Sequence, residues 1–154
     1  MNLGSILKPE AVRVMGSVTS KKRLMRDLSD VAAACYGIDA ETAMAALQDR
    51  ESIGPTGVGN GVALPHARIP GLDRVVGVFM KLERPVSFDA VDRVPVDLVF
   101  GLFAPDDSGV HHLKALAVVA RALRQTKVQM KLRANDDPLT LHAILVDAQE
   151  SQAA

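Results

Sequence analysis

Two long apolar runs restrict the fold of this chain more than any other feature. RVVGVFMKLE (74–83) and VDLVFGLFAP (96–105) are predominantly apolar, each with a continuous apolar centre broken only by a glycine. Strands of this kind are typical of the centre of a sheet that is covered on both sides. EAVRVMG (10–16) and VALPH (62–66) predict two shorter strands, the first from its alternation of apolar and polar residues.

Helical segments alternate with these strands. Five segments are predicted as helices, and they span 20–37, 40–51, 108–125, 127–134 and 138–149. Gly37 suits a C-terminal stop for the first, and Asp39 can cap the second. Asp137 followed by Pro138 gives the last helix an N-cap and a first-turn proline. The interleaving indicates the α/β class, with helices packed on a mixed central sheet.

Length and charge exclude several classes of protein. The 154 residues fit one domain, and Lys+Arg and Asp+Glu each number 18, so the chain lacks the basic excess of a nucleic-acid binder. No stretch approaches the roughly 20 apolar residues of a membrane span. Cys35 is the only cysteine, which excludes an internal disulfide and a Cys-based zinc site. We expect a cytoplasmic protein without a cofactor, a nucleic-acid partner or membrane insertion.

The glycine-rich stretch TGVGNGVALPHAR (56–68) leaves three interpretations open. A nucleotide loop is disfavoured, because no Gly-Lys-Ser/Thr follows the glycines and a strand comes next where a helix is required. The glycines could make only a tight turn. They could also leave backbone N–H groups open to an anion and admit a partner surface. The spacing favours a loop that contacts phosphate or a partner, with these candidate residues: Thr56, Gly57, Gly59, Asn60, Gly61 and Arg68.

His66 is distinguished from the other histidines by the proline before it. Pro65 fixes its own φ near about −65° and makes its neighbour extended. The imidazole is therefore expected at the end of a strand on a rigid backbone, where ligands of α/β sheets bind. Taken singly, any histidine of this chain could still be an ordinary structural or surface residue. His142 has nothing polar and distinctive around it.

The helix at 108–125 presents His111 and His112 to different surroundings. At about 100° per residue, His112 lies roughly 160° from Lys114, whereas His111 lies only about 60° from it. His112 is therefore predicted to face the core and His111 the solvent. Ser108 can cap this helix. The positive charge at the helix N-terminus disfavours an imidazolium, so we expect a neutral His112.

Two facing histidines would suit the transfer of a phosphoryl group. A histidine nucleophile can form a covalent intermediate, and phosphoryl transfer depends mainly on positioning and charge neutralisation. If His66 and His112 face each other, one attacks and the other helps to hold the negative group. Arg50 and Arg68 are candidates for the neutralising cation, because a guanidinium matches phosphate in a bidentate way. Either arginine could instead be solvated at the surface.

Three segments together resemble a known family: RESIGPTGVGNGVALPHAR, FDAVDRVPVDLVFGLFAP and HHLKALAVVARAL. They are similar to the IIA components of the bacterial phosphoenolpyruvate:sugar phosphotransferase system (PTS) of the fructose/mannitol type, and most similar to the nitrogen-regulatory IIA proteins. The shared core is G-x-G-x-A-x-P-H, followed downstream by His-Leu-x-x-Leu-Ala. The resemblance covers residues 5–148 as one EIIA domain, with 1–4 and 149–154 as tails.

The resemblance implies a fold and a chemistry. The fold is a single α/β domain with a central mixed β-sheet of about five strands flanked by helices. His66 would accept a phosphoryl group on Nε2 from a phosphorylated HPr-like carrier protein (NPr), with His112 as the second active-site histidine and Arg50 as an active-site arginine. Such a protein is a phosphotransferase component. Its output would be the regulation of target proteins by phosphorylation state.

Two departures from the family and three alternatives accompany this resemblance. Gly54-Pro55 stands where relatives commonly carry a Gly-Ser-Thr turn, and His111 is an extra histidine that could act as a rival donor. One alternative is a sugar-specific IIA that passes phosphoryl to a separate IIB component for sugar uptake. Another is a metal-dependent hydrolase using the two histidines and Asp89 or Asp92, although no close-set ligand pair is present. An interaction module that never receives phosphate is the third.

Overall fold

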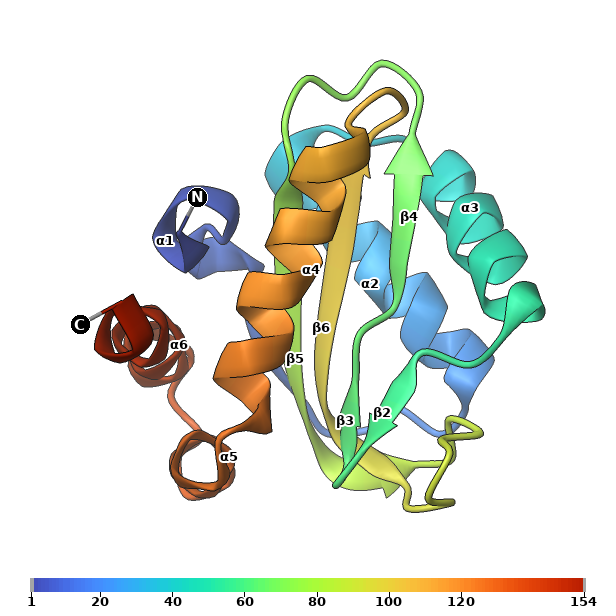
Figure 1. Ribbon diagram of the computed structural model, residues 1–154. Coiled ribbons are helices and arrows are strands. Elements are labelled where there is room, and N and C mark those ends of the chain that lie inside the picture. Colours follow the sequence, from blue (N-terminus) through green and yellow to red (C-terminus); the bar gives the residue numbers. More distant parts are fainter. Residues whose placement is uncertain (1, 154) are drawn as a thin grey trace.

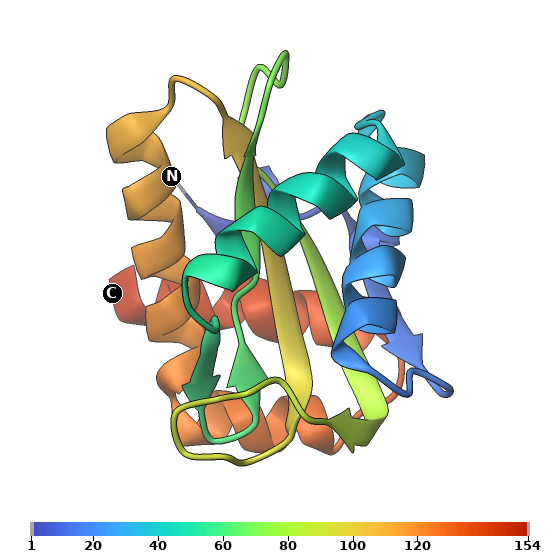
Figure 2. The same cartoon turned by 90° about the vertical axis from the view of Figure 1, so that its right-hand side faces the viewer.

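Helices cover both faces of a central sheet and give the protein three layers (Figures 1 and 2). This computed structural model describes the backbone of residues 2–153 and the side chains of residues 2–148. The helices are α1 (Leu3–Ile6), the 3-10 turn η1 (Pro9–Ala11), α2 (Lys21–Tyr36), α3 (Ala40–Ile53), α4 (Gly109–Arg124), α5 (Thr126–Arg133) and α6 (Pro138–Ala153). The strands are β1 (Val12–Met15), β2 (Gly57–Gly59), β3 (Val62–Ala63), β4 (His66–Ile69), β5 (Val76–Val86) and β6 (Val96–Pro105).

The sheet is mixed, as the α/β prediction requires. Its strand order is β1-β5-β6-β3-β2, and β4 also pairs with β6. The two apolar runs form β5 and β6, which are antiparallel with Phe79 opposite Phe100. β1 runs parallel to β5, while β3 and β4 both run parallel to β6.

The prediction of about five strands is wrong, because the described residues form six. The difference arises at Pro65. Ala63 lies opposite Val99 and His66 lies opposite Leu102, so β3 and β4 follow β6 in one continuous register. Pro65 has no N–H to donate to the ladder, and the strand is interrupted there. The segment expected as one short strand is therefore split in two.

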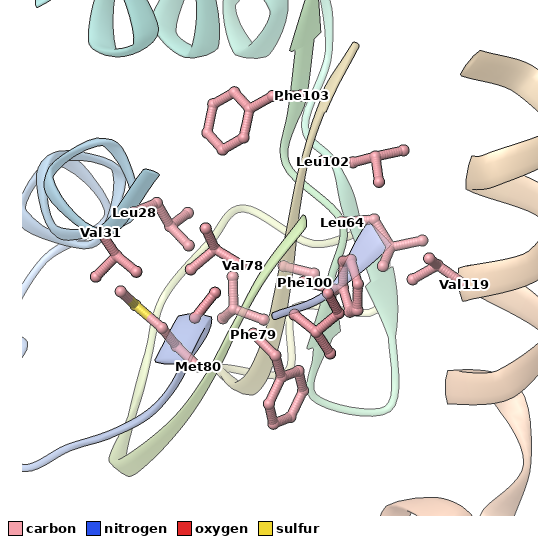
Figure 3. Close-up of a cluster of buried hydrophobic side chains, with 14 of the residues drawn as sticks. Leu28, Val31, Leu64, Val78, Phe79, Met80, Phe100, Leu102, Phe103 and Val119 are labelled. Carbon is pink, nitrogen blue, oxygen red and sulfur yellow. The ribbon is translucent and has the colours of Figure 1, made fainter. Parts of the chain in front are cut away.

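The core lies on both sides of the sheet, as the apolar runs predict. α2 and α3 cover one face, and α4 and α6 cover the other (Figures 1 and 2). Figure 3 shows Leu28 and Val31 of α2 on one side of the strands and Val119 of α4 on the other. The four phenylalanines of the chain are all buried: Phe79, Phe88, Phe100 and Phe103. Burial of each such side chain contributes about 2 kcal/mol to folding.

The ends of three helices confirm the predicted caps. Gly37 ends α2 in the left-handed conformation, with φ of 73°. The Asp39 carboxylate accepts the Thr42 N–H at 2.9 Å at the start of α3. Asp137 accepts the Thr140 N–H at 3.1 Å at the start of α6. These contacts pair donors that a helix N-terminus leaves unsatisfied.

Much of the two predicted tails takes part in secondary structure. Leu3, within the predicted tail 1–4, is fully buried in α1. α6 continues to Ala153, beyond the expected end at 149. Met1 and Ala154 lie outside the described residues. Among the helices that the structure describes, none has the length and apolar character needed to cross a membrane.

The glycine-rich stretch folds as a hairpin of β2 and β3 where a loop was expected. Gly59 pairs with Val62, so Asn60 and Gly61 form the two-residue turn between them. Their φ angles are 57° and 79°. Positive φ at both turn positions is the geometry that Asn-Gly favours in hairpins. The tight-turn interpretation is therefore right for this dipeptide.

Gly57 allows the loop between β5 and β6 to lie against β2. A Cβ atom at Gly57 would lie 2.7 Å from the Cβ of Ala90 and 3.0 Å from its Cα. Such distances are too short for carbon atoms, so any larger residue must push the loop away. This glycine serves packing, in contrast to the turn glycine after Asn60.

We predict that Gly57→Ala destabilises the protein by about 1–3 kcal/mol, because the added methyl group collides with Ala90. The double variant with Ala90→Gly should lose less stability than the sum of the two single variants. Urea unfolding of the four proteins measures this. Gly54→Ala is the matched control, since a Cβ there meets no atom within 4 Å. Strict additivity would show that the two residues do not collide.

Candidate functional site

His66 is the first residue of β4, directly after the interruption at Pro65. This corrects the expectation that it stands at the end of a strand. Its Nδ1 lies 2.8 Å from the carbonyl oxygen of Leu64. A carbonyl oxygen can only accept, so Nδ1 carries the proton and Nε2 keeps its lone pair. The residue is half-buried.

Arg50, in the last turn of α3, is directed at the same imidazole. Its Nε donates to Nε2 of His66 over 3.2 Å, and its Nη1 donates to the carbonyl of Gly54 over 3.0 Å. A hydrogen bond donated to Nε2 agrees with a lone pair on that atom. Arg68, the other candidate cation, lies two residues after His66, so its exposed side chain is on the same face of β4.

His112 lies beside His66 in the first turn of α4. The ring centroids are 5.3 Å apart and the ring planes meet at 72°. His112 is only 6% exposed, whereas His111 is exposed, as the helical spacing predicts. Nε2 of His112 has no hydrogen-bond partner among the described residues. Leaving a buried polar atom unpaired costs about 1–3 kcal/mol, so this atom is ready to bind an incoming group.

Both imidazoles are held in the neutral form at neutral pH. Burial lowers the pKa of His112 to about 4, with smaller contributions from His66 when it is protonated and from the cations Arg68 and Arg50. Burial also lowers the pKa of His66, while the hydrogen bond to Leu64 opposes this shift and the charge of Arg50 adds to it. The sequence predicted a neutral His112 from the helix N-terminus, but burial is the main cause.

Ser108 does not cap α4 in the way that the sequence predicts. Its backbone is already helical, with φ of −78° and ψ of −15°, and its side chain makes no capping hydrogen bond. The hydroxyl donates instead to the Pro105 carbonyl at 2.8 Å. The Ser108 hydroxyl therefore stabilises the turn after β6 and does not cap α4.

The predicted phosphate or partner loop separates into two parts. Thr56 donates its N–H and its hydroxyl to Glu51, at 2.8 and 2.6 Å. At the hairpin turn, the Asn60 N–H donates to Asp92 at 2.9 Å, and the Asn60 carbonyl accepts from Arg133 at 2.7 Å. About 16–20 Å of extended chain separates this turn from His66. The Asn60 amide is thus occupied by a carboxylate and is not open to phosphate.

Sequence reasoning missed three groups around the site. They are the Leu64 carbonyl on Nδ1, the Glu51 carboxylate, and Lys21, whose Nζ lies 2.9 Å from Glu51. Backbone carbonyls leave no trace in a sequence, and Lys21 lies on a different helix from Glu51. The one available signal was the adjacency of Arg50 and Glu51 just before the glycines.

The structure gives no support to the metal-dependent hydrolase alternative. Asp89 lies 3.4 Å from Lys21, and Asp92 accepts the amides of Asn60 and Val94. In residues 2–148, no three His, Cys, Asp or Glu side chains are arranged to hold a metal ion. Neither carboxylate therefore joins the two histidines in a ligand set.

Comparison with known proteins shows the family to which this chain belongs. The family model described as "Phosphoenolpyruvate-dependent sugar phosphotransferase system, EIIA 2" matches residues 5–148. The chain belongs to this EIIA family. As an EIIA protein it is a phosphotransfer component of a PTS, and its fold is the one that the resemblance implied, with one strand more.

Relatives within the EIIA family align with most of the length of this chain. It is 41% identical over 145 residues to the nitrogen regulatory protein of Bradyrhizobium diazoefficiens, covering 94% of this chain and 95% of that protein. The Escherichia coli nitrogen regulatory protein is 37% identical, with 97% and 92% covered.

Solved structures of related proteins share the fold. The crystal structure of the nitrogen regulatory protein IIA-Ntr from Neisseria meningitidis has a TM-score of 0.85 and 33% identity, over 92% of this chain and 97% of that one. The IIA mannitol structure from Escherichia coli has a TM-score of 0.72 over 88% and 96%. At 20% identity, the similarity to the mannitol protein supports the fold and nothing about function.

We predict that the protein loses stability as the pH falls from about 6.5 towards 4. The pKa of His112 is about 4 in the folded state. Between these pH values the unfolded chain binds a proton at His112 that the folded chain does not, so acid favours unfolding. His112→Gln should remove on the order of 2 kcal/mol of the loss between neutral and mildly acidic pH. Urea unfolding of the wild type and His112→Gln, at neutral and at mildly acidic pH, tests this. An equal loss of unfolding free energy in the two proteins would contradict it.

Proposed function

We propose that this EIIA protein carries a phosphoryl group on Nε2 of His66 and regulates partner proteins through its phosphorylation state. One observation carries the proposal. The lone pair of Nε2 faces Arg50, and the ring of His112 lies nearby with a buried Nε2 that has no hydrogen-bond partner among residues 2–148. A nucleophile, a cation and a buried polar atom thus lie on neighbouring side chains, an arrangement that suits an incoming phosphoryl group.

The transfer step uses His66 in its neutral form. Nε2 attacks the phosphorus of a phosphorylated HPr-like carrier (NPr) in line with the donor's P–N bond. As the new P–Nε2 bond forms, the donor bond breaks and its electron pair returns to the donor nitrogen. Nδ1 keeps its proton throughout, and its hydrogen bond to the Leu64 carbonyl stabilises the positive charge that develops on the ring.

Arg50 and His112 bind the oxygens of the transferred group. The Arg50 guanidinium already lies on Nε2 and needs only a small shift to reach oxygens attached there. A neutral His112 donates an N–H without adding a charge that must be removed from water. Its low pKa follows first from burial, so it stays neutral at any pH near 7. Arg68, exposed on the same face of β4, adds positive potential.

The regulatory output is supported by the kinds of relative that the chain has. The proteins at 36–41% identity are named nitrogen regulatory proteins or their homologue. A phosphoryl group adds about two negative charges to a half-buried histidine, and this change can alter a partner surface by charge alone. A cytoplasmic location remains a prediction from the sequence.

Sugar uptake through a separate IIB component is the second candidate. The fructose-specific EIIA component of Haloferax volcanii is 27% identical to this chain. A solved complex of the Escherichia coli mannitol IIA with its phosphorylated IIB has a TM-score of 0.75 at 19% identity. Restored uptake of one sugar in a strain that lacks its own IIA would favour this candidate over the regulatory one.

We predict that His66→Ala abolishes labelling by a phosphorylated carrier, because the variant has no Nε2 to attack phosphorus. Incubation with a ³²P-labelled HPr-like carrier and electrophoresis measures the label. His111→Ala is the matched control: His111 is exposed on the same turn as His112, and its loss should leave the rate unchanged. If His66→Ala is still labelled, the acceptor is a residue other than His66. If only His111→Ala loses the label, the acceptor is His111.

We predict that His112→Ala and Arg50→Ala are still labelled, but about 100-fold more slowly. Each variant loses one donor to the phosphoryl oxygens and keeps the nucleophile. Single-turnover transfer from the carrier, and back to the unphosphorylated carrier, gives the rates in both directions. If a variant transfers at the wild-type rate in both directions, the residue that it lacks takes no part in the transfer.

A further inference from the structure

Glu51 is a nearly buried carboxylate next to the site, with 6% of its side chain exposed. Its Oε1 accepts the Thr56 N–H at 2.8 Å and lies 2.9 Å from Nζ of Lys21, while Oε2 accepts the Thr56 hydroxyl at 2.6 Å. Within the described residues it makes no hydrogen bond to either imidazole. A carboxylate tolerates burial only when it is paired in this way.

These contacts close the turn 51–56, and the same turn holds Arg50. The Gly54 carbonyl within the turn accepts Nη1 of Arg50 at 3.0 Å. The Nε of that guanidinium donates to Nε2 of His66 at 3.2 Å. Because a guanidinium is planar and rigid, fixing one nitrogen on the turn directs the other at the imidazole. The carboxylate of Glu51 is thus connected to His66 by contacts through Gly54 and Arg50, while its charge also acts on the imidazole directly and raises the pKa of His66.

Lys21 supplies the countercharge for Glu51. Its Nζ also donates to the Phe88 carbonyl at 3.3 Å, and it lies 4.5 Å from the centroid of the Phe88 ring and 3.4 Å from Asp89. The countercharge matters because the site receives a group with about two negative charges. An unneutralised carboxylate on the neighbouring turn would repel that group.

We propose that Glu51, neutralised by Lys21, is a positioning residue for phosphoryl transfer to His66 and acts through Arg50. The inference rests on the proposed role of His66. It predicts that Glu51 matters for the rate mainly while Arg50 is present, because without Arg50 only its direct electrostatic effect on His66 remains. A residue that merely stabilises the fold would affect the rate equally with or without Arg50.

A double-mutant cycle tests this dependence. We expect Glu51→Gln, which keeps the size of the side chain and one oxygen, to slow labelling of His66 about tenfold in the otherwise wild-type chain. In the Arg50→Ala background, the same change should alter the rate less than about twofold. Equal slowing in both backgrounds, or no slowing in either, would overturn the proposal.

An NMR measurement gives a second readout that does not depend on activity. The Nε–H proton of Arg50 should be protected from solvent exchange in the wild type and lose this protection in Glu51→Gln. Glu41→Gln is the matched control, since Glu41 pairs with Arg26 at 2.8 Å on the exposed side of the same helix. Arg50 protection that survives Glu51→Gln refutes positioning. If the wild type shows the expected protection but no labelling, the function of His66 fails and the positioning of Arg50 stands.

The countercharge is tested with Lys21→Met. This variant leaves Glu51 charged and unneutralised, so labelling should slow by about tenfold or more. Adding Glu51→Gln removes the buried charge and should restore part of the rate. A double variant that is slower than Lys21→Met alone would overturn the role of Lys21 as countercharge.

Discussion

One hydrogen bond determines the chemistry of the site: the contact between Nδ1 of His66 and the Leu64 carbonyl. It places the proton on Nδ1 and leaves the lone pair on Nε2, where Arg50 meets it. The bond forms where Pro65 interrupts the strand between β3 and β4, while both strands stay in register with β6. The sheet therefore holds the His66 side chain, and a backbone carbonyl two residues earlier orients its imidazole.

The positive charge at the site is local and is not visible in the net charge of the chain. Positive and negative residues balance at 18 each. Around the two imidazoles, however, the charges of Arg50 and Arg68 act together, and the nearby Glu51 is already paired with Lys21. Burial keeps both imidazoles uncharged and so prevents further repulsion among the cations. A neutral protein can thus offer an anion a positive site without a basic surface of the kind that binds nucleic acid.

The sequence predicted what depends on periodicity and missed what depends on backbone contacts. Apolar runs indicated β5 and β6, and helical spacing placed His112 inward and His111 outward. Pro65 was recognised, but its division of one strand into β3 and β4 was not. The glycines suggested an anion loop, yet Asn60-Gly61 makes a hairpin turn whose amide is taken by Asp92. Local motifs indicate where a chain turns, and only coordinates show which atoms remain free.

The proposed mechanism also indicates how phosphorylation reaches the surface. Nε2 of free His66 is bonded to Arg50, so a phosphoryl group on that atom must move the guanidinium onto its oxygens. Arg50 also holds the Gly54 carbonyl, and Ile53, directly before it, is 82% exposed. A shift of Arg50 would therefore act on a turn that carries an exposed apolar residue.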